Sequence, residues 1–319
     1  MKFLAVTFNP ARDATYLLER FVRGSANRVV SQQVMPGGKG NNVARVLAAY
    51  GHAVRVTGFL AGNDGSFIDN GLRAAGIESA FTWLASGESR TCHTLIERET
   101  GSVSEVLESG PTVSTRDGEA FLTALPGRLS GIDTVVSCGS LPPGLDGSFL
   151  ARFMSIARQG CKQLVVDSSG EGLRIALSCG PDLIKPNETE LATLMGGTPS
   201  IDEMVRYAQE DMIGSVMPAE GRVLLSLGER GAVLIGRSEV WHAAAPPITP
   251  REIVNTVGCG DALLAGFLDG CAGNLPAQDA LALAVAFGAA AALSDVAGVV
   301  DGVELGRLRP TVTVTPWGA

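Results

Sequence analysis

Short runs of β-branched and aliphatic residues alternate with helical patterns from about residue 130 onward. This alternation is typical of parallel strands joined by helical crossovers, and it predicts an α/β fold with a mostly parallel sheet. A chain of 319 residues is long enough to bury a substantial core in this way. The predicted strands span 134–137, 163–167, 182–184 and 223–226, after a first strand within 1–10.

Each of these later strands ends in a polar or glycine-containing loop. In open α/β sheets, ligands bind at the carboxyl ends of the strands. We therefore expect four loops to converge on one crevice, and they are 140–144, 167–170, 185–188 and 227–231.

A second region has a different pattern. Residues 91–97 and 103–108 flank a turn and alternate with the period of a β-hairpin. Together with 16–34 they predict a small antiparallel sheet over the crevice, which could act as a lid that excludes water. An edge hairpin or a dimer surface is the alternative. We place the lid strands at about 12–35 and 88–110, inserted in one domain that spans 1–319.

A glycine-rich turn at 255–260 runs into a helical pattern and carries an aspartate at the junction. Gly258 and Gly260 allow close approach of a ligand, and the helix N-terminus offers unpaired N–H groups to an anion. Asp261 could accept the proton of an attacking hydroxyl beside that anion site. The alternative is a strand-to-helix turn in which Asp261 is a first-turn residue favoured by the helix dipole.

An earlier glycine segment, 35–47, also leads into a helix. It matches neither the phosphate-binding GxxxxGK[ST] pattern nor the dinucleotide-binding GxGxxG pattern. Lys39 would act there as a point charge, and Asn42 as a hydrogen-bond donor and acceptor. A loop glycine cluster with a solvated lysine is the structural alternative.

Composition excludes several classes of partner. A net charge of −8 and a pI near 5, without a cluster of Lys and Arg, argue against binding nucleic acid or an anionic membrane surface. The uncharged stretch 280–293 is shorter than the roughly 20 residues that span a bilayer, so we interpret it as a buried helix. Six scattered cysteines without a CxxC pair indicate free thiols in the cytoplasm.

The two glycine segments occur in the same order and separation as the two signatures of the PfkB, or ribokinase-like, sugar kinases, which this chain resembles over nearly its whole length. Its blocks 9–13, 37–40, 89–92, 108–111, 139–144 and 185–187 resemble the sugar-phosphate branch, the 1-phosphofructokinases and tagatose-6-phosphate kinases. The resemblance implies a ribokinase-like three-layer α/β/α sandwich with a mostly parallel central sheet and a small β-sheet lid. It also implies ATP and Mg²⁺ as cofactors.

The resemblance assigns roles on the substrate side. Asp261 would be the catalytic base, and the backbone of Gly258, Cys259 and Gly260 would form the anion hole. Asp13 and Asn42 would bind sugar hydroxyls. Lys39 and Arg90 would hold the phosphate already present on the substrate. The remaining residues of this set, which belong to the matching glycine and Ser-Leu-Pro blocks, are Gly37, Gly38 and Ser140.

On the nucleotide side, 185–190 resembles an Asn-x-x-Glu element. Glu190 would organise hydrated Mg²⁺, Asn187 would contact phosphate, and Lys185 belongs to the same block. The structural alternative is that Asn187 caps a helix that starts at Glu188, with Glu190 completing a capping box. By the resemblance, the nucleotide-side loop would contain Ser226, Gly228 and Gly231.

The expected reaction is ATP-dependent phosphorylation of a ketohexose monophosphate to the bisphosphate. Fructose 1-phosphate and tagatose 6-phosphate are the leading substrates, with fructose 6-phosphate next. A kinase of an unphosphorylated sugar or nucleoside is one alternative, which Lys39 and Arg90 argue against. A non-catalytic sugar-phosphate sensor is another, which Asp261 and Glu190 argue against. We expect no nucleic-acid or membrane partner, and a homodimer, if formed, through the lid.

Overall fold

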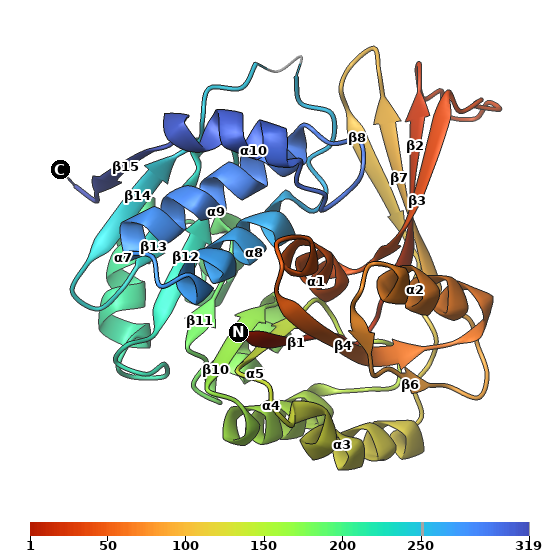
Figure 1. Cartoon of the computed structure of the whole chain (residues 1–319), viewed down its shortest axis with the longest axis horizontal. Coiled ribbons are helices and arrows are strands. Elements are labelled where there is room, and N and C mark those ends of the chain that lie inside the picture. The colour runs from red at the N-terminus through yellow and green to blue at the C-terminus, as the bar shows by residue number, and fades with distance from the viewer. Residues whose placement is uncertain (250–251, 319) are drawn as a thin grey trace.

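The computed structural model describes residues 1–249 and 252–318 and contains a large central sheet and a smaller second sheet (Figure 1). The strands of the central sheet are β1 (Lys2–Thr7), β4 (Ala53–Leu60), β5 (Glu78–Ser79), β6 (Thr82–Trp83), β9 (Thr134–Cys138), β10 (Gln163–Asp167), β11 (Leu183–Ile184), β12 (Arg222–Ser226), β13 (Ala232–Ile235), β14 (Val240–Ala244) and β15 (Thr313–Pro316). All the strands predicted from the alternation are therefore confirmed, with ends that differ by one or two residues.

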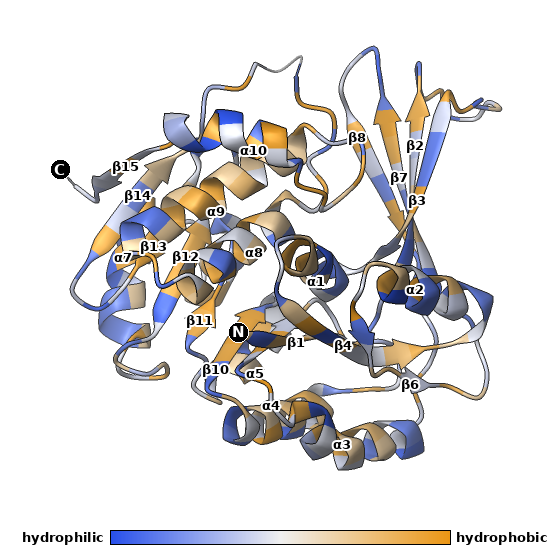
Figure 2. Ribbon diagram, viewed as in Figure 1, coloured by the Kyte–Doolittle hydropathy of each residue, from blue (hydrophilic) through white to orange (hydrophobic). Residues whose placement is uncertain are grey.

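The central sheet is mostly parallel, as predicted. Its order is β15-β14-β13-β12-β11-β10-β9-β1-β4-β5, with β6 also paired to β4. Strands β12 to β5 along this order pair in parallel, whereas β13, β14 and β15 add an antiparallel end. The parallel strands read as continuous hydrophobic runs in Figure 2 because helices cover both of their faces.

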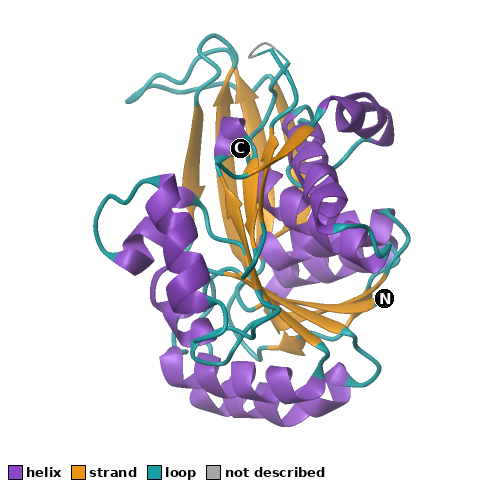
Figure 3. Cartoon of the chain, turned by 90° about the vertical axis from the view of Figure 1, so that its left-hand side faces the viewer, coloured by secondary structure: helices purple, strands orange, loops and turns teal. Residues whose placement is uncertain are grey.

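Helices cover the sheet on both sides and make the three-layer arrangement (Figure 3). One side holds α1 (Lys39–Ala49), α2 (Gly62–Ala74), α8 (Cys259–Ala272), α9 (Ala277–Ala292) and α10 (Gly302–Leu308). The other side holds α3 (Thr115–Leu129), α4 (Gly147–Gly160), α5 (Gly170–Leu177), α6 (Glu188–Met195) and α7 (Ile201–Tyr207). Side chains alternate between the two cores along β1: Phe3 and Ala5 enter the first, and Leu4 and Val6 the second.

The alanine-rich stretch near the C-terminus is the buried helix α9, as expected. Its small side chains allow close packing on α8, and a Cβ on Gly266 would lie only 2.6 Å from Phe287. Within the described residues, the helices lack the length and apolarity needed to cross a membrane.

The second sheet consists of β2 (Ala11–Leu18), β3 (Ser31–Gly37), β7 (Arg90–Glu97) and β8 (Val103–Leu107), in the order β3-β2-β7-β8. It projects beyond the helices in Figure 1. The predicted hairpin is confirmed as β7 and β8. The predicted all-antiparallel pairing was wrong, because β2 and β7 pair in parallel. Both strands start near the carboxyl ends of central strands, β1 and β4 respectively, so they leave the core in the same direction. The segment 16–34 is likewise not one stretch of strand, since 19–30 connects β2 to β3.

Candidate active site

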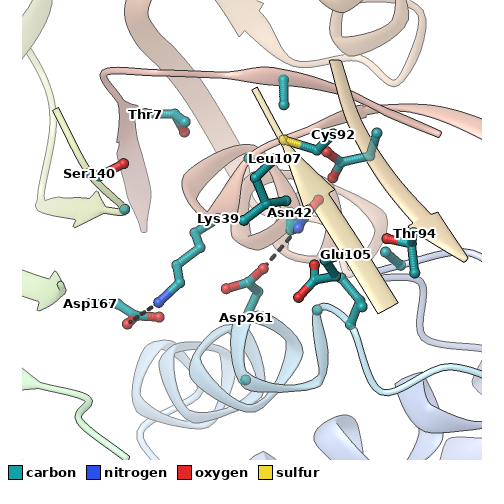
Figure 4. Close-up of a pocket in the computed structure, with 18 of the residues that line it drawn as sticks. Thr7, Lys39, Asn42, Cys92, Thr94, Glu105, Leu107, Ser140, Asp167 and Asp261 are labelled. Carbon is teal, nitrogen blue, oxygen red and sulfur yellow. Dashed lines mark hydrogen bonds and ion pairs between the residues drawn. The ribbon is translucent and has the colours of Figure 1, made fainter. Parts of the chain in front are cut away.

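A cavity of about 740 Å³ lies between the carboxyl ends of the central strands and the small sheet. Figure 4 shows side chains from both sheets and from α1 and α8 that point into it. The predicted site residues that line it are Asp13, Gly38, Lys39, Asn42, Arg90, Ser140, Lys185, Asn187, Glu190, Ser226, Gly258, Gly260 and Asp261. Residues as far apart in the sequence as Asp13 and Asp261 are thus brought to one place.

Four predicted residues do not line this cavity: Gly37, Cys259, Gly228 and Gly231. A Cβ on Gly37 would lie 1.9 Å from the Asp13 carboxylate, so this glycine makes room for a residue that does line it. Gly231 has a φ of +90°, and a Cβ there would lie 2.0 Å from the Ala243 carbonyl oxygen. Its need to be glycine therefore comes from packing against β14, and the nucleotide role of the 227–231 loop stays a prediction.

Asp261 occupies the first turn of α8 and is 5% exposed. One of its oxygens, Oδ2, accepts a hydrogen bond of 2.8 Å from Asn42 Nδ2 of α1. Burial, together with repulsion from Asp167, raises the pKa of Asp261 to about 7, against the opposing effects of Asn42, Lys39 and Lys185. A buried carboxylate with a pKa in this range is well suited to accept a proton at neutral pH.

The N-terminus of α8 forms the predicted anion-binding turn. Gly258 caps the helix in the left-handed region, at a φ of +81°, and a Cβ there would lie 2.6 Å from the Gly298 nitrogen. Within the described residues, no protein acceptor pairs with the backbone N–H groups of Gly260 and Asp261. The N–H of Cys259 instead makes a long turn hydrogen bond, 3.4 Å, to the Thr256 carbonyl. The N–H groups of Gly260 and Asp261 are therefore the donors available to an anion. They lie at a helix N-terminus, which favours negative charge.

Two lysines meet at a fully buried carboxylate beside this turn. Asp167, at the end of β10, lies 3.2 Å from Lys39 Nζ through Oδ1 and 3.2 Å from Lys185 Nζ through Oδ2. Burial lowers the pKa of Lys39, but the nearby carboxylates, Asp167 first, outweigh it and hold that pKa above its usual value. A Cβ on Gly260 would lie 3.5 Å from Lys185 Nζ, which places this ammonium next to the anion-binding turn. Two positive charges thus flank the turn.

Lys39 and Arg90, the predicted phosphate ligands, line the same cavity and contact different partners. Lys39 reaches toward Asp167 and Asp261, as Figure 4 shows for its ammonium. Arg90 begins the lid strand β7, where Nε donates to the Asn9 carbonyl at 3.1 Å and Nη1 to the Glu108 carbonyl at 3.3 Å. The substrate-phosphate roles of Lys39 and Arg90 therefore both stay predictions.

The small sheet forms one wall of the cavity with alternate residues of its strands. Those residues are Asp13 and Thr15 of β2, Cys92 and Thr94 of β7, and Val103, Glu105 and Leu107 of β8. Burial raises the pKa of Asp13 to about 6, although Arg45, the Gly38 N–H and Arg90 oppose that rise. The wall therefore presents both hydrogen-bonding and apolar groups to a ligand.

Asn187 and Glu190 line the cavity at the start of α6 and also form the capping box that was the structural alternative. Asn187 Oδ1 accepts from the Glu190 N–H at 2.8 Å, and Glu190 Oε2 accepts from the Asn187 N–H at 2.9 Å. In the part of the chain that the structure describes, no cluster of three acidic, His or Cys side chains could hold a metal by itself. A metal here would need ligands from phosphate and water, which is usual for Mg²⁺.

Sequence reasoning missed three residues of the site: Asp167 and Thr7, which line the cavity, and Arg45, which contacts the lining residue Asn42. Asp167 and Thr7 end parallel strands, and that position alone could have marked them. Arg45 follows Asn42 by three residues, hence one turn of α1, and hydrogen-bonds to it at 2.9 Å. Its helical spacing from Asn42 was the available signal.

The chain is similar to known proteins over nearly its whole length. Residues 6–299 match the pfkB family carbohydrate kinase profile. The 1-phosphofructokinase of Bacillus subtilis (strain 168) is 34% identical over 97% of this chain and 98% of its own length. The 1-phosphofructokinase of Rhodobacter capsulatus is 34% identical over 98% of both chains. In fold, the chain resembles phosphofructokinase-2 from Escherichia coli in complex with substrates and products, with a TM-score of 0.86, 24% identity and coverage of 97% and 99%.

The fold is the ribokinase-like one, with a three-layer core and a second, smaller sheet, and the family match defines the class of protein as a carbohydrate kinase. The chain belongs to the pfkB family of carbohydrate kinases. It is therefore an ATP-dependent carbohydrate kinase, as the two glycine segments indicated.

The pH dependence of kcat/KM should follow the ionisation of Asp261. A base with a pKa of about 7 is protonated, and so inactive, below that pH. We expect kcat/KM to be nearly constant above pH about 8 and to fall about tenfold per pH unit below pH about 6.5. Initial rates between pH 5.5 and 9 in buffers of constant ionic strength would measure this. A flat profile down to pH 5.5 would contradict the role of this carboxylate.

Proposed function

We propose that this kinase phosphorylates a free hydroxyl of a fructose monophosphate to give the bisphosphate, with fructose 1-phosphate as the first candidate substrate. The observation that carries the proposal is that Asp261 and the open N–H groups at the start of α8 line the same cavity as Asp13 and Arg90, the residues proposed for the sugar side. Two relatives at 34% identity over nearly the full length have the name 1-phosphofructokinase, which supports the choice of substrate. Tagatose 6-phosphate is the second candidate.

In the proposed reaction, Asp13 and Asn42 bind sugar hydroxyls and orient the acceptor. Asp261 accepts the proton of the attacking hydroxyl as its oxygen forms a bond to the γ-phosphorus of ATP. The bond from that phosphorus to the bridging oxygen of the β-phosphate breaks, and ADP leaves. The open N–H groups at the start of α8, with the Lys39 and Lys185 ammonium groups, stabilise negative charge on the transferring group.

Glu190 and Asn187 fit the proposed role of holding hydrated Mg²⁺ at the nucleotide phosphates. Both line the cavity, and the capping box fixes the direction of each side chain. Bound with ATP, the ion would neutralise phosphate charge. Lys185 and Ser226 line the same side, and we assign the nucleotide to this side, with Gly228 and Gly231 in the neighbouring loop.

A substrate panel tests the proposal. ADP release would be measured with ATP and Mg²⁺ against fructose 1-phosphate, tagatose 6-phosphate, fructose 6-phosphate and the free sugars. We expect the highest kcat/KM for fructose 1-phosphate. A preference for a free sugar or a nucleoside would overturn the sugar-phosphate assignment, and binding without turnover would favour the sensor. The Asp261→Asn variant is the background control.

Replacement of Arg90 by alanine should raise KM for the fructose phosphate by about 10- to 100-fold, the range of a lost hydrogen bond to a charged group. The reason is that Arg90 is the guanidinium at the lid end of the cavity. KM for ATP and turnover of a free sugar should change little. Steady-state kinetics with each substrate varied in turn would measure these values.

A matched control is Arg98→Ala, because Arg98 pairs with Glu19 on the exposed outer part of the same sheet. It should leave every kinetic constant close to wild type. An equal loss in the two variants would mean that Arg90 acts only through the stability of the lid.

We also assign to the lid a self-association surface between two copies of this chain. The edge strand β8 exposes Val106 and Leu107 at 57% and 58%, and the β2–β3 connection exposes further apolar side chains. An unpaired edge with exposed apolar residues favours pairing with a second copy. Sedimentation velocity should show a dimer that Val106→Asp converts to monomer, and a monomeric wild type would reject the assignment.

The six free thiols fit our proposal of a cytoplasmic location.

A further inference from the structure

Arg45 is a buried cation that the proposed mechanism does not yet use. It lies in α1, is 8% exposed, and has no carboxylate within ion-pair distance among the described residues. Its Nη2 donates to Asn42 Oδ1 at 2.9 Å and to the Ala297 carbonyl at 2.6 Å. Burying a charge without a direct counter-ion is unfavourable, so its retention in this position calls for a specific task.

The hydrogen bond to Asn42 determines which end of the amide faces Asp261. A guanidinium has only donors, so it can contact only the oxygen end of the Asn42 amide. The nitrogen end must then point the other way, where Nδ2 donates to Asp261 Oδ2 at 2.8 Å. Rotation of the amide by half a turn would bring its oxygen against the Asp261 carboxylate and its nitrogen against the Arg45 guanidinium, so both contacts favour the same orientation. When Asp261 is protonated, the contact with Arg45 still holds the amide in place.

The charge of Arg45 acts on the same groups. Burial lowers the pKa of Arg45, whereas Asp13 and Asp261 raise it, and Arg45 in turn lowers the pKa of Asp13. Arg45 thus favours the ionised form of both carboxylates. The other charged or titratable groups near Asp261 are Asp167 from β10, Lys39 from α1, Lys185 after β11, Cys138 from β9 and Cys259 from α8.

Arg45 also connects α1 to the backbone beside the anion-binding turn. It holds the Ala297 carbonyl, and the adjacent Gly298 packs so closely on Gly258 that a Cβ on Gly258 would lie 2.6 Å from the Gly298 nitrogen. A shift of this loop would therefore move the turn at the start of α8.

We propose that Arg45 is a positioning residue for phosphoryl transfer, which locks the Asn42 amide in the one orientation that donates to Asp261. This inference rests on the proposed role of Asp261 as the base. Arg45 does not touch the reacting groups itself. It acts through Asn42, so its loss should affect kcat and the pH dependence of kcat more than the binding of ATP.

Arg45→Met tests the proposal with a neutral side chain of similar length. We expect kcat to fall about tenfold, as for one lost hydrogen bond to a charged group, with KM for ATP changed by less than about twofold. The acid limb of the kcat profile should move up by about one pH unit, because the hydrogen bond from Asn42 lowers the pKa of Asp261. Arg45→Lys, which keeps the charge but not the planar fork, should give a smaller shift of the limb and serves if Arg45→Met does not fold.

Arg128→Met is the matched control for loss of a partly buried arginine. Arg128 lies in α3, outside the cavity, with Nη2 on Thr82 and its guanidinium over the Phe121 ring. This variant should lower thermal stability and leave kcat and the acid limb unchanged. If Arg45→Met likewise lowered thermal stability but left kcat and the acid limb unchanged, Arg45 would have only a structural role and the proposal would fail.

A double-mutant cycle with Asn42→Ala isolates the route of the effect. In the Asn42→Ala background, Arg45→Met should produce little further change in kcat, because the amide that it orients is absent. The acid limb should move less than in the wild-type background, by the part that is due to the Arg45 charge alone. Equal effects in the two backgrounds would overturn the proposal. The Asp261→Asn variant separates this failure from failure of the proposed function. If Asp261→Asn keeps its activity, Asp261 is not the base and the proposed mechanism itself is wrong. If Asp261→Asn is inactive, the mechanism stands and only the role of Arg45 is rejected.

Discussion

Replacement of Asp261 by asparagine is expected to lower kcat by about 10²- to 10⁴-fold, the usual loss when a general base is removed. Asparagine has nearly the same shape and can still accept the hydrogen bond from Asn42 through its amide oxygen, so the geometry at the start of α8 should persist. What it lacks is the ability to take a proton. KM for ATP and the thermal midpoint should therefore stay close to wild type.

ADP release at saturating substrates measures this loss. Asp269→Asn is a control in the same helix, because Asp269 lies two turns further along α8 and pairs with His52 outside the cavity. It should keep turnover near wild type. Retention of more than about a tenth of wild-type kcat in Asp261→Asn would show that another group accepts the proton.

Replacement of Asp167 by alanine is expected to lower the free energy of unfolding by about 3 to 5 kcal/mol, as when one partner of a buried ion pair is removed. The reason lies in the two lysines. The Lys39 side chain is 42% exposed and can turn toward water, whereas that of Lys185 is 6% exposed and would keep an uncompensated buried charge. Urea unfolding of the purified variant measures the change.

The exposed pair of Arg152 with Glu119 provides the matched comparison. Glu119→Gln removes one charge of an ion pair in water, where such pairs contribute little, and should leave unfolding nearly unchanged. An unfolding midpoint of Asp167→Ala equal to that of the wild type would contradict this prediction. It would mean that Lys185 becomes neutral or is hydrated in the variant, so that no uncompensated charge stays buried. The acid limb of the residual activity should move to lower pH, because Asp167 contributes to the raised pKa of Asp261.

Local patterns along the chain were sufficient for much of the fold. The β-branched runs predicted β9, β10, β11 and β12, because strands buried on both faces must be hydrophobic throughout. The capping box at Asn187 and Glu190 was also predictable, since its two hydrogen bonds join residues three positions apart. Gly258 was recognisable because a left-handed turn before a helix favours glycine.

Pairing between distant segments was not predictable in the same way. The lid strands β2 and β7 were expected to be antiparallel, and their parallel pairing follows from where each chain segment leaves the core. The same limit applies to Asp167, whose two partners lie 128 and 18 positions away, and to Arg45, which is held by a carbonyl 252 positions further on.

The sequence by itself determined the alternation of strands and helices, the two glycine-rich turns and the position of Asp261 at the start of a helix. These features were predictable because propensity, turns and caps are properties of neighbouring residues. Only the tertiary structure decided that Lys39 contacts Asp167 and that Arg45 donates a hydrogen bond to Asn42. Those choices depend on burial and on charge shared between elements far apart in the chain. A buried charge or amide takes the orientation that satisfies its partners, and the fold alone determines which partners are present.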